Sequence, residues 1–220
     1  MIETDTKDIL LLACKDIRHI LLGFCSSKIV GTLAQGEVTT LLRRWTLAYP
    51  SIWADLNADF QAILQGLDKV VDAFPDDPWT RAMRGRASVA IRYYPAAFQD
   101  YEIALSYAPD HALLNILMGE THFFHAAHTM NDPADCYITA IFYLSRAICL
   151  YLNDPRPYIT RAQACARLLK HFDYPRDSGY FIARFHEIMV DFEHARTLTT
   201  PSAHGSIDAM EQKVKALFDL

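Results

Sequence analysis

The hydrophobic positions of the chain recur at intervals of three and four residues, which is the period of an amphipathic α-helix. Residues 6–24 show the pattern first, with apolar side chains at Ile9, Ala13, Ile17, Ile20, Leu21 and Phe24. The same period predicts further helices over residues 38–49, 56–74, 79–91, 96–107, 178–196 and 207–217. The predicted fold class is therefore all-α.

The segment over residues 78–109 predicts two helices joined by a short turn. Pro95 marks the start of the second helix because proline is favoured in a first turn, and Pro109 ends it because proline lacks a backbone N–H. Gly85 allows the two helices to approach closely. Ala97 and Ala104 are seven residues apart and share one face of the second helix. These small residues predict a tight antiparallel contact.

The landmarks of this helix pair recur further along the chain. An offset of 34 residues relates Pro75 to Pro109 and Gly85 to Gly119. The offset then becomes 43 for the alanines, which recur as Ala140 and Ala147. The longer offset predicts an insertion of nine residues over 128–136, where the run Asn131, Asp132 and Pro133 favours a turn.

Residues 76–196 resemble the tetratricopeptide repeat (TPR) family, whose 34-residue repeat folds as a helix-turn-helix unit. The first unit supplies five positions of the family pattern: Gly85, Ala97, Tyr101, Ala104 and Pro109. The second unit keeps Gly119, Ala140 and Ala147, with Met118 and Leu144 as apolar replacements and His122 at an aromatic position. The third unit is degenerate and offers Tyr158, Ala162, Ala183 and Val190.

The resemblance implies antiparallel helix pairs stacked as a short TPR-like right-handed solenoid with divergent capping helices. Three regions follow: N-terminal helices over residues 1–75, TPR-like repeats over 76–196, and a loop with a capping helix over 197–220. Ile63 and Val70 stand where the pattern asks for alanine, which indicates a capping or divergent pair. We expect the final helix to cover the last repeat, with docking on a partner as the alternative.

Composition and charge exclude several classes of partner. Hydrophobic residues make up 51% of the chain, which argues against disorder. The 21 basic and 26 acidic residues give a net charge of −5, so neither nucleic acid nor an anionic membrane is an expected partner. The charges around the first apolar run do not fit a secretory signal, and no window approaches the length of a membrane span.

The cysteines indicate a reducing compartment. They are odd in number and lack the spacing of metal ligands: Cys14, Cys25, Cys136, Cys149 and Cys165. Because they lie within helical patterns, we expect reduced and packed thiols in a cytoplasmic protein.

Two clusters carry candidate chemistry. His122, His125 and His128 follow one another at intervals of three, so neighbouring rings could reach one metal ion while the outer two diverge around the helix. We therefore expect no metal and no other cofactor, with His122 filling an aromatic repeat position. The second cluster, His186, Glu187, Glu193 and His194, has the spacing of a solvated helix face. No phosphate-binding loop or nucleophile elbow is present in the sequence.

The family resemblance implies a binding groove lined by the first helix of each unit. The groove positions carried over to this chain include Trp79, Arg86, Glu120, Phe123, Arg156, Gln163 and Arg167. Ala82, Arg86 and Leu117 occupy positions where chaperone-binding members carry lysine and asparagine, which disfavours chaperone tails as ligands. The three arginines predict a partner with acidic residues, because arginine binds carboxylates through two parallel hydrogen bonds.

The sequence thus favours a noncatalytic adaptor or interaction module that binds a peptide or partner subunit. An enzyme that is metal-dependent or acts on a small molecule, using the His122, His125 and His128 region, is the first alternative. A structural subunit that self-associates into a homo-oligomer is the second. Metal analysis would separate the enzyme from the other two.

Overall fold

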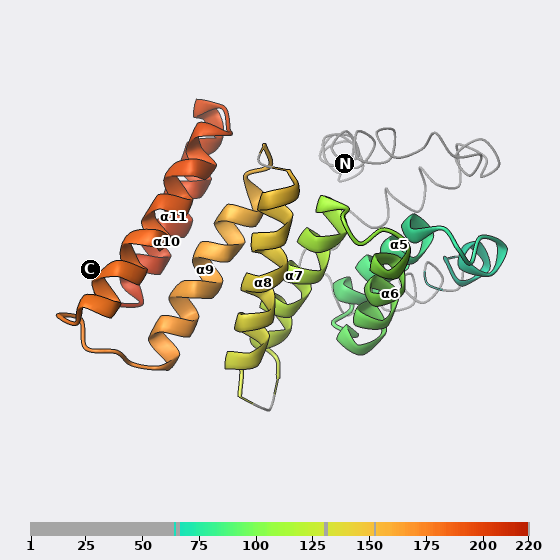
Figure 1. Cartoon of the computed structure of the whole chain (residues 1–220), viewed down its shortest axis with the longest axis horizontal. Coiled ribbons are helices and arrows are strands. Elements are labelled where there is room, and N and C mark those ends of the chain that lie inside the picture. Colours follow the sequence, from blue (N-terminus) through green and yellow to red (C-terminus); the bar gives the residue numbers. More distant parts are fainter. Residues whose placement is uncertain (1–63, 65–66, 130–131, 152, 220) are drawn as a thin grey trace, which may run out of the picture. The chain divides into compact units, whose positions relative to one another are not determined.

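The computed structural model describes residues 64, 67–129, 132–151 and 153–219 of the chain (Figure 1). Two compact units divide the chain, over Met1–Ala73 and Phe74–Leu220. The helices predicted over residues 6–24 and 38–49, most of the helix predicted over 56–74, and Cys14, Cys25 and Ile63 lie outside the described residues.

In Figure 1 the helices of the second unit run from α5 and α6 on the right, through α7, α8 and α9, to α10 and α11 on the left. The elements are α5 (Pro78–Ala90), α6 (Tyr94–Tyr107), α7 (Ala112–Ala126), α8 (Ala134–Leu150), α9 (Arg156–His171), α10 (Gly179–Thr197), the short 3-10 helix η2 (Pro201–Ala203) and α11 (His204–Ala216). No strand occurs among the residues that the structure describes, which confirms the all-α class for this part of the chain. No helix in this part is both long and apolar enough to cross a bilayer.

Neighbouring helices form the pairs α5/α6, α7/α8 and α9/α10, and each pair also contacts the next through α6 with α7 and α8 with α9. We call α5, α7 and α9 the first helices and α6, α8 and α10 the second helices. The first helices also contact one another, α5 with α7 and α7 with α9.

Local sequence explains where several helices begin. Asp77 caps α5 by accepting a hydrogen bond from the Thr80 amide at 3.0 Å, and proline follows at the first helical position. Ser178 caps α10 in the same way. Asp132 Oδ1 accepts a bond of 2.8 Å from the Ala134 amide, so α8 begins inside the insertion predicted over residues 128–136. The loop between α7 and α8 is accordingly shorter than predicted.

The predicted small residues lie at the contacts within the first two pairs. The helix residues at these crossings are fully buried: Ala97 and Ala104 in α6, and Ala140 and Ala147 in α8. A methyl group added to Gly85 would come within 2.9 Å of the Tyr101 ring, and one added to Gly119 within 2.7 Å of Leu144 Cγ. The close approach predicted at Gly85 is confirmed, and Gly119 makes an equally close contact.

The third pair has a different register from the predicted one. Ala162 of α9 is fully buried, as expected, but Ala183 is exposed and Val190 is only partly buried. The buried positions of α10 that match the spacing of Ala97, Tyr101 and Ala104 are Ile188, Phe192 and Ala195. The prediction was wrong because more helical residues separate the two buried positions in this pair. Helix α9 continues nine residues beyond Ala162 and α10 begins nine residues before Ile188, whereas α7 continues seven beyond Gly119 and α8 begins six before Ala140.

The final helix covers the last pair. Ile207 and Val214 of α11, with Phe218 just beyond it, are buried in one cluster with Phe181 and Phe192 of α10. Helix α11 contacts both α9 and α10. Helix α11 thus packs on the last pair, as expected of the final helix, and it begins at His204 rather than at Ile207.

Candidate functional site

The groove residues that the sequence predicts belong to the first helices: Trp79 and Arg86 to α5, Glu120 and Phe123 to α7, and Arg156, Gln163 and Arg167 to α9. Arg86 of α5 and Glu120 of α7 form an ion pair, with 3.7 Å between Arg86 Nη1 and Glu120 Oε2. The arginine side chain is 41% exposed and the glutamate 17%, so the pair lies at the edge between surface and core. It links the first helices of two successive pairs, and it gives Arg86 a carboxylate partner within the chain.

Trp79 lies near the start of α5 and is partly buried. Its ring meets the His111 ring edge to face, with 4.6 Å between the ring centroids. His111 precedes α7, and burial lowers the pKa of its imidazole. Trp79 thus packs between two helix pairs and keeps part of its surface accessible.

Phe123 belongs to the packing of the α7/α8 pair more than to an open groove. Its ring contacts those of Phe124 and Tyr137, at 5.6 and 6.1 Å between centroids. It also packs against a buried cluster that includes Ala140 and Leu144. Phe123 therefore offers a partner only the part of its ring that this packing leaves uncovered.

The two arginines predicted on α9 have different surroundings. Arg156 forms hydrogen bonds of 3.1 and 2.5 Å from Nε and Nη2 to Asp154 Oδ2, and thereby holds the start of the helix. Arg167 is exposed and lies beside Tyr137 of α8. Burial raises the pKa of the Tyr137 phenol, and the nearby Arg167 charge offsets part of that effect. Gln163 lies one turn before Arg167 and is partly buried.

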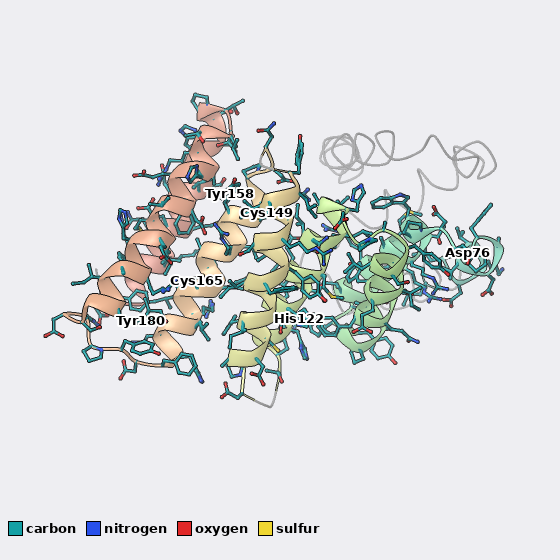
Figure 2. The ribbon with its side chains drawn as sticks, viewed as in Figure 1. Asp76, His122, Cys149, Tyr158, Cys165 and Tyr180 are labelled. Atoms are coloured by element: carbon teal, nitrogen blue, oxygen red, sulfur yellow. The ribbon has the colours of Figure 1, made fainter. Side chains whose placement is uncertain are left out.

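His122, labelled in Figure 2, lies between two aromatic rings from different helices. The Phe98 ring of α6 stacks on it at 4.3 Å and the Tyr143 ring of α8 at 6.1 Å, measured between centroids. Burial, with a smaller contribution from His125, lowers the pKa of His122 to about 4. At neutral pH, His122 is therefore an uncharged aromatic spacer at the contact of three helices.

His125 and Cys136 form the closest approach to a catalytic pair, with 3.6 Å between Nδ1 and Sγ. Burial, followed by the charge of Asp135, raises the pKa of the Cys136 thiol, so it stays protonated near neutral pH and lacks the reactivity of a thiolate. His128 stacks on Tyr94 at 5.9 Å. Within the described part of the chain, no three His, Cys, Asp or Glu side chains gather where they could hold a metal ion.

The second charged cluster lies on the solvent side of α10. His186, Glu187, Glu193 and His194 are all exposed. Glu187 pairs with Arg184, and the His194 ring stacks on Tyr158 of α9. The arrangement is that of the polar face of an amphipathic helix.

Sequence reasoning missed a repeated ion pair inside the helix pairs. Arg84 of α5 bonds Asp100 of α6 through Nε and Nη2 at 2.9 and 2.6 Å, and Arg161 of α9 bonds Asp191 of α10 at the same two distances. In both pairs the arginine immediately precedes the small residue of the first helix, which is Gly85 or Ala162. An arginine immediately before the small residue of the first helix was therefore the sequence signal that could have identified both ion pairs.

The described cysteines are free thiols with different degrees of burial. Cys136 and Cys165 are partly buried, and burial raises the pKa of Cys165 to about 11. Cys149 is exposed, so the expectation that all the thiols are packed was wrong for this residue. Cys149 lies on the outer side of α8, away from the core.

No protein-family model matches the chain, and none of the curated proteins matches it either.

Proposed function

We propose that this chain is a noncatalytic interaction module of TPR-like architecture that binds an acidic peptide or partner segment on the surface of α5, α7 and α9. The stacked helix pairs, the small residues at their crossings and the repeated arginine–aspartate pair support a repeat architecture. The free thiols support a reducing compartment such as the cytoplasm.

The observation that carries the proposal is that α7 contacts both α5 and α9. Charged and accessible side chains lie on these three helices. Arg86 and Glu120 join α5 to α7 at this surface, and Arg167 is exposed on α9. Such a surface spans several pairs, which suits an extended segment better than a compact small molecule.

The predicted arginines favour a partner with carboxylate groups, because the guanidinium donates hydrogen bonds to carboxylates. Arg86 is already engaged with Glu120 across 3.7 Å, so a partner carboxylate could share its five N–H donors. Arg156 is held by Asp154 at the start of α9. Among the described residues no carboxylate forms an ion pair with Arg167, which is exposed beside Tyr137, and we assign it the strongest contact with a carboxylate of the partner.

A charge reversal tests this surface. Partners recovered with the wild-type protein from its native cells would be identified, and the affinity of one would be measured for Arg167→Glu and for the control Arg92→Glu. Arg92 is an exposed arginine in the turn between α5 and α6. We expect Arg167→Glu to weaken binding about tenfold or more, because one charge-assisted hydrogen bond is worth about 1.5–3 kcal/mol. Equal affinities for both variants and the wild type would exclude the first-helix surface.

A further inference from the structure

The outer side of α8 carries an apolar stripe, defined here as Ile138, Phe142 and Cys149. The spacing of four and seven residues places all three on one face of the helix. Ile138 is 49% exposed, Phe142 is 60% exposed, and Cys149 is also exposed. Neighbouring exposed apolar side chains on one helix face mark a candidate interaction surface.

The other second helices carry different residues at the stripe positions. The buried residues of α6, α8 and α10 give a common alignment, in which Ala97, Ala140 and Ile188 are equivalent. In this alignment, the residues at the stripe positions are Pro95, Gln99 and Ser106 in α6, and His186, Val190 and Thr197 in α10. Most of these are polar. Gln99 of α6 shows that a helix pair can pack with a polar residue at the Phe142 position, where α10 carries the apolar Val190.

Charges of opposite sign flank the stripe. Asp135 lies about one turn before Ile138, and Arg146 lies about one turn after Phe142. If a second α8 lay antiparallel across a two-fold axis, Ile138 of each copy would face Phe142 of the other, and Asp135 of each would face Arg146 of the other. A single alignment of the two helices therefore pairs apolar with apolar and acidic with basic side chains. An isologous interface requires such self-complementarity.

We infer that a second copy of this chain docks on α8, with the two α8 helices antiparallel and the Ile138, Phe142, Asp135 and Arg146 side chains forming the contact. This surface lies on a second helix, so the inference is independent of the partner proposed for the first helices. Arg146 pairs within the chain with Asp110, at 3.0 Å. That pair is exposed, with Asp110 78% accessible, and the guanidinium has enough donors to bond both carboxylates.

The proposed contact between the two α8 helices is small. One helix face per copy is less than the area of about 800 Å² per partner that a standard stable interface buries. We therefore expect a reversible dimer with a dissociation constant in the micromolar range, which requires measurement over a wide concentration range.

Sedimentation velocity on the full chain tests the inference, from about 1 µM to about 500 µM. We expect a monomer–dimer equilibrium for the wild type. Phe142→Gln, which installs the residue that α6 carries at this position, should raise the dissociation constant about tenfold or more. The control Glu102→Lys changes an exposed charge on α6 and should leave the equilibrium unchanged.

A charge swap then tests the register. Asp135→Lys and Arg146→Glu should each weaken the dimer, because each places like charges opposite one another. The combined variant should return to within about threefold of the wild type, since it restores an opposite pair in the reversed order. Circular dichroism melts would confirm that every variant is folded. A wild type that stays monomeric throughout, an unaffected Phe142→Gln dimer, or a swap that fails to restore association would each overturn the inference.

Discussion

Arg161 of α9 holds the carboxylate of Asp191 of α10 through two hydrogen bonds, of 2.9 and 2.6 Å. Asp191 is buried, and Arg161 reaches it with a side chain that is 25% exposed. The Asp191 bonds raise the pKa of Arg161 against the opposing effect of burial. The two side chains thus depend on each other, because removing either leaves a poorly hydrated charge.

Asp191→Ala should lower the free energy of unfolding by about 2–3 kcal/mol, because it leaves the Arg161 charge without its partner in a partly buried place. The double variant Arg161→Met/Asp191→Ala should regain at least half of this loss, since methionine buries no charge. Chemical denaturation of the single and double variants measures the coupling. Glu187→Ala serves as the control: its pair with Arg184 is exposed on both sides, so its effect should stay below about 0.5 kcal/mol. A double variant less stable than Asp191→Ala would contradict the argument.

Gly119→Ala should destabilise the protein by about 1–3 kcal/mol even though alanine favours helices. The added methyl group would meet Leu144 Cγ at 2.7 Å, and the branch carbon of leucine cannot turn away without moving the side chain. Gly205→Ala in α11 is the matched control, because nothing lies within 4 Å of the position of its added methyl group. It should leave stability unchanged or raise it by up to about 1 kcal/mol. Thermal and denaturant unfolding would compare the two.

Ala195→Leu and Ala183→Leu separate the observed register of α10 from the predicted one. Ala195 is fully buried, so leucine there should cost about 1–3 kcal/mol of stability, as should Ala104→Leu and Ala147→Leu in the other second helices. Ala183 is exposed, so Ala183→Leu should change stability by less than about 0.5 kcal/mol. If Ala183→Leu lowered stability strongly and Ala195→Leu only slightly, the predicted register of α10 would be the correct one.

The difference between these two alanines shows what could be predicted from the sequence. In α6 and α8, small residues seven apart flank a large one, and the pattern identified Ala97, Ala104, Ala140 and Ala147 correctly as buried. In α10 the first of these positions is Ile188, so the small-residue signal is lost. The longer stretches of helix after Ala162 in α9 and before Ile188 in α10 also break the fixed offset on which the alignment relied.

The arginine–aspartate pairs were missed because spatial neighbours need not keep a constant sequence separation. Arg84 and Asp100 are 16 residues apart, whereas Arg161 and Asp191 are 30 apart. The candidate groove was predicted only as a set of helix positions. That Arg86 faces Glu120 depends on how side chains extend across the contact of α5 with α7, and that Arg156 bonds Asp154 depends on the turn before α9. Helical periodicity specifies neither.

The last prediction concerns pH and rests on His122 between Phe98 and Tyr143. Burial lowers the pKa of His122 in the folded protein to about 4, whereas the unfolded chain has the ordinary value of 6.5. Between these two values the unfolded state binds a proton that the folded state does not, so stability should fall as the pH drops from about 6.5 to about 4. Above pH 6.5 both states are neutral at this ring and the effect vanishes.

A full shift of this size would be worth about 3 kcal/mol, and partial exposure of the ring reduces the expected loss to about 1–2 kcal/mol. His122→Phe keeps an aromatic ring in the stack and removes the titrating group, so the variant should lose less stability than the wild type between pH 7 and pH 5. Denaturant unfolding at both pH values provides the comparison, with His186→Asn on the exposed side of α10 as the control. Burial also lowers the pKa of His125, so part of the acid sensitivity should survive in the variant. If wild type and His122→Phe lost the same stability on acidification, the neutral ring at the contact of α6, α7 and α8 would not be the cause.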